Sequence, residues 1–167
     1  MEALTKEQKY LLASNQGGAL LNAGASWSAL RNAGASLSDL LNAGASLSAL
    51  RGDLNEDDIP LVKKPYSRML AEIKAGERIH KQSTFGPENA PVVHTCGTPM
   101  CTGGHLVQMG GKKGWKLKER FGFAGAAALI HAKAHPGWPC QDFGSIPQDW
   151  AMAYIETMAK REAKEAA

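Results

Sequence analysis

The chain has 167 residues, 44% hydrophobic and 21% charged. This length allows one modest core, or a small core with an appended repeat, and excludes a large multidomain enzyme. The net charge of +3 is far short of the basic excess typical of nonspecific DNA binding. The first residues, MEALTKEQKYLLASNQ, lack the pattern of a signal peptide, and no stretch approaches the roughly 18 apolar residues of a membrane span. We therefore expect a cytoplasmic protein with no membrane partner.

Residues 15–51 repeat with a period of ten. The recurring positions include Gly24, Gly34 and Gly44, and Leu20, Leu30, Leu40 and Leu50. One continuous α-helix is excluded, because ten residues advance a helix by about 1000° and the apolar stripe would slip by roughly 80° per repeat. The period therefore predicts an interrupted structure that stacks repeat on repeat.

Two structures fit this repeat. In a solenoid of short helices, Ser36 is an N-cap, Leu37 and Leu40 point inward, and Gly44 ends the helix. In the alternative the true period is five, which resembles a degenerate member of the pentapeptide-repeat family and implies a right-handed β-helix. That geometry turns Trp27, Leu37 and Leu47 outward, as a candidate binding surface or a homo-oligomer contact. We favour the short helices and keep the β-helix as the alternative.

Three regions follow from these patterns: a capping helix at 6–13 and repeat arm within residues 1–51, an acidic linker at 52–64, and a small helical domain at 65–167. The fold class is therefore mainly α. Within the last region, Gly and Pro breaks leave a loop at 80–95. The helices are expected at 65 to about 76, 105–109, 115–121, 124–134 and 146 to about 165.

The last of these helices has the clearest pattern. Ser145 and Gln148 form a capping box, and Pro147 fits the first turn. The residues expected to share one buried stripe are Trp150, Ala151, Tyr154, Ile155 and Met158.

Candidate metal ligands gather within twelve residues: His94, Cys96, Cys101 and His105. Two thiolates and two imidazoles suit tetrahedral zinc, although the spacing departs from that of a zinc knuckle. His131, His135 and Cys140 are an alternative set, but Pro136 disfavours a helical conformation at the residue before it. The competing interpretation is that the three cysteines are reduced and buried. Zinc is thus the one cofactor the sequence suggests.

A basic segment follows the Cys/His segment. Lys112, Lys113 and Lys116 alternate with aromatic residues, a pattern compatible with nucleic-acid binding. Trp115, Leu117 and Phe121 also suit the inner face of a helix, however, with the lysines on its solvated face. We favour the solvated face, so nucleic acid is a disfavoured partner.

Most of the chain resembles a group of uncharacterised phage and bacterial proteins of pentapeptide-repeat type. The shared segment is His-x-Cys-Gly-Thr-x-x-Cys-x-x-Gly, which matches His94, Cys96, Gly97, Thr98, Cys101 and Gly104. The resemblance implies phage or prophage association and no particular activity.

Neither a nucleotide-binding loop nor a zinc-deaminase signature is present, since Pro139-Cys140 lacks the second cysteine that the latter needs. The sequence therefore favours a non-enzymatic protein-interaction module with an unidentified protein partner, acting on a host complex if phage-encoded. Two alternatives stay open: a zinc- or thiol-dependent enzyme centred on Cys96 and Cys101, and a nucleic-acid binder using Lys112 to Arg120.

Overall fold

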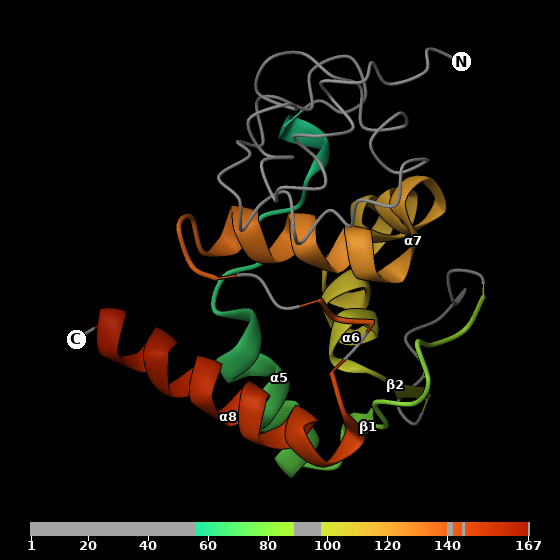
Figure 1. The fold of residues 1–167 in the computed structure, drawn as a ribbon. Helices are drawn as coiled ribbons and strands as arrows, with labels where there is room; N and C mark the ends of the chain where they lie inside the picture. Colours follow the sequence, from blue (N-terminus) through green and yellow to red (C-terminus); the bar gives the residue numbers. More distant parts are fainter. Residues whose placement is uncertain (1–55, 89–97, 140–141, 145, 167) are drawn as a thin grey trace, which may run out of the picture.

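The computed structural model describes residues 56–88, 98–139, 142–144 and 146–166 (Figure 1). The elements in this part are a short 3-10 helix η2 (Glu56–Asp58), α5 (Pro65–Lys74), β1 (Ile79–His80), β2 (Pro99–Met100), α6 (Thr102–Met109), α7 (Gly111–Ala134) and α8 (Gln148–Glu165). The expected small helical domain is confirmed for this part of the chain. The repeat arm, with its helical and β-helical alternatives and its capping helix at 6–13, lies outside the described residues.

The helices pack as two pairs. α5 lies beside α8, and α6 lies against α7 (Figure 1). Between them is one core, whose largest fully buried side chains are Tyr66, Met69, Met100, Leu106, Leu117, Leu129, Ile130 and Phe143. Ile59 and Val62, from the stretch expected to be an acidic linker, also belong to this core. The packed region therefore begins before α5.

The start of α5 follows directly from its sequence. Pro65 occupies the first helical position, where its fixed φ is favourable and its missing N–H costs nothing. Tyr66 and Met69 are buried, and Leu70 and Ile73 pack against the core from the same face. These residues form one apolar face of α5 that is directed at the core.

The corner between α6 and α7 depends on glycine. Gly111 has a φ of 57°, which turns the chain between the two helices. A Cβ atom on Gly114 would lie 2.1 Å from the carbonyl oxygen of Val107. The first turn of α7 therefore packs against the backbone of α6 itself, at a distance that a side chain would prevent.

A second glycine interrupts α7. Gly122 has φ 71° and ψ 175°, so the helix is two segments joined by a non-helical residue. The sequence predicts separate helices at 115–121 and 124–134, and this break confirms the division. Trp115, Leu117 and Phe121 face inward on the first segment, as the solvated-face interpretation of the lysines requires.

The start of α8 differs from the prediction. Its N-cap residue is Pro147, with no capping side chain, while Ser145 lies outside the described residues. The Gln148 side chain accepts a hydrogen bond from the backbone N–H of Ser83 rather than closing a capping box. The predicted capping box at Ser145 and Gln148 is therefore wrong, because the expected N3 residue bonds to a distant loop.

The short parallel pairing of β1 with β2 was not predicted. Ile79 pairs with Pro99, and His80 pairs with Met100. Of these residues, only His80 lies in the stretch expected to be a loop at 80–95. Two-residue strands are too short to show an alternating pattern in the sequence. The pairing brings the chain after α5 alongside the start of α6.

We predict that Gly114→Ala lowers the free energy of unfolding by about 2–3 kcal/mol, because the added methyl group must push the α6 backbone away. Urea denaturation measures the loss. Lys116→Ala, an exposed change on the same helix, is the control and should stay within about 0.5 kcal/mol of the unmodified protein. Equal stability of the two variants would contradict the close approach of α6 and α7.

Candidate functional site

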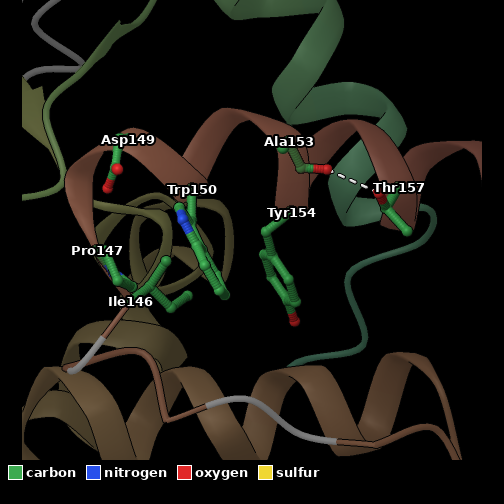
Figure 2. A pocket seen from close by; sticks show the side chains of 7 residues that line it. All are labelled: Ile146, Pro147, Asp149, Trp150, Ala153, Tyr154 and Thr157. Atoms are coloured by element: carbon green, nitrogen blue, oxygen red, sulfur yellow. Dashed lines mark hydrogen bonds between the residues drawn. The ribbon is translucent and has the colours of Figure 1, made fainter.

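An apolar groove runs along one side of α8 (Figure 2). Its volume is about 470 Å³, and its lining residues are Ile146, Pro147, Asp149, Trp150, Ala153, Tyr154 and Thr157. Figure 2 shows the side chains of Trp150 and Tyr154 projecting in the same direction from successive turns of the helix. The groove thus has two aromatic rings side by side along its wall.

Trp150 is the residue that departs most from its expected environment. The sequence places it in the buried stripe of α8, but 68% of its surface is exposed. Ala151, Ile155 and Met158 form the buried stripe without it, and Tyr154 lies at the border. The prediction for Trp150 is wrong because an apolar ring at the edge of a helical stripe can face either the core or the solvent, and periodicity does not decide which.

Tyr154 links the groove to a polar network in the core. Its hydroxyl lies 3.4 Å from the hydroxyl of Tyr66, which is fully buried. The Tyr66 hydroxyl in turn lies 2.6 Å from Nδ1 of His131. One wall of the groove is therefore tied by hydrogen bonds to both α5 and α7.

Glu162 is the centre of this network. Its carboxylate accepts hydrogen bonds from the backbone N–H groups of Tyr66 at 3.0 Å and Ser67 at 2.7 Å. It also lies 2.8 Å from Nε2 of His135, at the end of α7. Lys64, at the N-cap position of α5, makes no side-chain cap. A carboxylate from α8 therefore caps α5 in its place and complements the positive end of that helix.

The electrostatics of Glu162 follow from these contacts. Burial on its own would raise the pKa of the carboxyl group, but the hydrogen bonds from His135, Ser67 and Tyr66 outweigh it and lower the pKa. The charged form is thus stabilised inside the protein by specific donors. The ring of Trp138 stacks on His135, with the two ring centres 4.0 Å apart. The guanidinium carbon of Arg161 lies 4.1 Å from the ring centre of Trp138.

His131 is buried as a neutral group. Burial, with a smaller contribution from His135, lowers its pKa to about 4. Its buried Nε2 atom has no hydrogen-bond partner among the described residues. His131 and His135, two members of the alternative metal set, do come close, with ring centres 5.7 Å apart. Their nearest polar contacts are to Tyr66 and Glu162, however, and Cys140 lies outside the described residues.

The Cys/His segment is only partly described. His94 and Cys96 lie outside the described residues, so the four-ligand zinc prediction stays a prediction. Cys101 is the N-cap residue of α6, and its sulfur accepts a hydrogen bond from the backbone N–H of Gly104. Burial raises the pKa of this thiol, which favours the unreactive protonated form.

His105 packs against His80, with ring centres 5.7 Å apart. Among residues 56–88 and the later described stretches, no three His, Cys, Asp or Glu side chains are grouped as metal ligands would be.

The basic segment lies along the first half of α7. Lys112, Lys113 and Lys116 are exposed, and Lys113 donates a hydrogen bond to the carbonyl of Asp57. Trp115 and Phe121 are 7% and 8% exposed, so their rings are not presented for base stacking. The other candidate binding residues, Trp27, Leu37 and Leu47, lie outside the described residues.

Two important residues were missed by the sequence analysis. Glu162 stands in an Ala-, Lys- and Glu-rich stretch that resembles any solvated helix end, and its backbone partners are 96 and 95 residues away. His80 stands alone in a stretch expected to be a loop. No local signal identifies either one, because each gains its role only when distant elements meet.

The chain matches no protein-family model, no curated protein and no solved structure. Within the described part, none of the helices has both the length and the apolar character needed to cross a membrane.

We predict that Glu162→Gln lowers the free energy of unfolding by about 2–4 kcal/mol, because the amide cannot accept from both backbone donors and removes the charge. Urea denaturation at neutral pH measures the change. Glu165→Gln, one turn later on an exposed site, is the matched control and should change stability by less than about 1 kcal/mol. If both variants were equally stable, Glu162 would not be the cap of α5.

We predict that His131 makes the protein less stable as the pH falls from 6.5 towards 4. The folded protein holds this imidazole neutral, so over that range the unfolded chain binds more protons and the free energy of unfolding decreases. His131→Asn keeps a polar atom near the position of Nδ1 but does not titrate. Its stability should therefore fall by about 3 kcal/mol less across the same range. Denaturation series at several pH values give the comparison, and parallel curves for the two proteins would contradict the neutral buried state.

Proposed function

We propose that the protein is a non-enzymatic interaction module whose groove on α8 receives an apolar side chain from a partner protein. The observation that carries this proposal is Trp150, a large ring left 68% exposed beside an apolar groove. Tryptophan is enriched among the residues that dominate binding energy at protein interfaces. The groove, with a volume of about 470 Å³, is large enough to hold one or two side chains of a partner.

Two further features support this use of the groove. Tyr154 is restrained by its contact with Tyr66, so part of the groove wall is already ordered before binding. Preorganisation of this kind reduces the entropy lost on association. Asp149 adds a carboxylate to the mainly apolar lining. A partner segment with an apolar anchor followed by a Lys or Arg residue fits this combination best.

The chemistry of the buried groups favours an interaction module over an enzyme. His131 and His135 contact Tyr66 and Glu162, and Cys101 caps α6 with a thiol that is hard to ionise. Each of these groups therefore has a structural role in the described part of the chain. From the family resemblance given by the Cys/His segment, we propose that the partner is a host protein bound by a phage- or prophage-associated chain.

We predict that Trp150→Ala weakens binding of partner peptides by about 30-fold or more. The probes are peptides selected from a random library on the unmodified full chain, and fluorescence anisotropy measures their affinity. Leu61→Ala is the matched control, since Leu61 is also apolar and exposed but lies outside the groove. Both variants should keep normal stability, because both side chains face solvent.

A photo-crosslinking residue at position 153 locates the contact independently. The expected result is a crosslinked product at this position that disappears when Trp150→Ala is added. Peptides that bind the Trp150→Ala variant with unchanged affinity, or crosslinks that form from position 61 instead, would contradict a partner site in the groove.

A further inference from the structure

His80 and His105 form a second cluster, away from the groove. His80 is the last residue of β1, and His105 lies in α6, so the pair joins β1 to α6. The side chain of His105 is 1% exposed, and the four ring nitrogens of the pair are buried with no hydrogen-bond partner in the part of the chain that the structure describes. This is the largest concentration of unsatisfied polar atoms among the described residues.

Such an arrangement is costly unless something binds it. A buried polar group without a partner lowers the stability of the fold, and here several such groups lie side by side. Two neutral imidazoles each offer one lone pair and one N–H group. Two neighbouring imidazoles with free lone pairs supply the donor type of a transition-metal ion, for which imidazole is the commonest protein ligand.

The ring separation suits a shared metal ion. A zinc ion bound at about 2.0–2.1 Å by one nitrogen of each ring would lie about 3.2 Å from each ring centre. A tetrahedral angle at the metal then places the two ring centres about 5.2 Å apart, and a linear angle about 6.4 Å apart. The observed separation is 5.7 Å, with the ring planes tilted by 32°.

The surroundings keep both rings in the form that binds metal. Burial, with smaller contributions from Arg78 and His80, lowers the pKa of His105 to about 3, and burial also lowers the pKa of His80. The charge of Arg78 is offset by an ion pair with Glu72, and its guanidinium also bonds to Gln108. The Ile79 carbonyl lies near enough to His105 to raise its pKa slightly, although no hydrogen bond of normal geometry joins them. Metal-bound histidines commonly use such a carbonyl to orient the ring.

We propose that His80 and His105 are two ligands of a zinc-type divalent metal ion that cross-links β1 to α6. Cys101 and the two histidines are not grouped as metal ligands in the described part of the chain, and the Cys101 sulfur contacts the first turn of α6. Water completes the coordination. This site shares only His105 with the four-ligand set predicted from the sequence, adds His80, and does not depend on the groove of α8.

Zinc binding by the metal-free full chain tests this assignment, with competition against a chromophoric chelator as the readout. The unmodified protein should bind about one Zn²⁺ per chain and unfold at a higher temperature when zinc is added. His80→Gln should weaken binding by more than about 100-fold, since loss of a hydrogen bond to a metal ligand alone costs roughly 10- to 100-fold. His105→Gln should do the same.

Cys101→Ser is the matched control. Serine is a good N-cap residue, so α6 should form normally and zinc affinity should stay unchanged. Absence of stoichiometric zinc binding, unchanged affinity in His80→Gln, or loss of zinc in Cys101→Ser would each overturn the proposal.

A measurement on the unmodified protein covers the case in which His105→Gln does not fold. Imidazole ¹⁵N NMR spectra, recorded before and after addition of Zn²⁺, report directly on each ring nitrogen. The expected result is a metal-induced shift at one nitrogen of His80 and one of His105. Shifts confined to other histidines would overturn the assignment.

Discussion

The arrangement of α5, α7 and α8 depends on one buried carboxylate. Glu162 is held in its charged form by two backbone N–H groups at the start of α5 and by His135 at the end of α7. Burying a charge is unfavourable unless donors satisfy it, and breaking such a set exposes the full cost. The three helices can therefore pack in this way only if the Glu162 carboxylate, the two backbone N–H groups and His135 are all in place.

This constraint extends to the groove. Glu162 caps α5, and this helix carries Tyr66. The Tyr66 hydroxyl is hydrogen-bonded to both His131 and Tyr154. Tyr154 lines the groove, so the position of its ring depends on how α5 docks against α8. Trp150, one turn earlier, has no such restraint and faces solvent. The groove thus combines a fixed aromatic wall with an exposed aromatic ring, which is a suitable combination for receiving a partner side chain.

Local signals were enough to predict the helices but not the site. The helix predicted from residue 65 matches α5, and the separate helices predicted at 115–121 and 124–134 match the division of α7 at Gly122, because both features depend on neighbouring residues alone. The role of Glu162, the pairing of β1 with β2 and the contact of His80 with His105 depend on residues far apart in the chain. The exposure of Trp150 was also missed, since it is decided by which neighbours cover the edge of a helical stripe.

Native-state hydrogen exchange of the Tyr66 and Ser67 amides tests the central claim most directly. First-turn amides of a helix have no acceptor within the helix and ordinarily exchange fast. If the Glu162 carboxylate caps α5, both amides should be protected nearly as strongly as the buried core and should lose that protection in Glu162→Gln. Fast exchange of both amides in the unmodified protein would contradict the account.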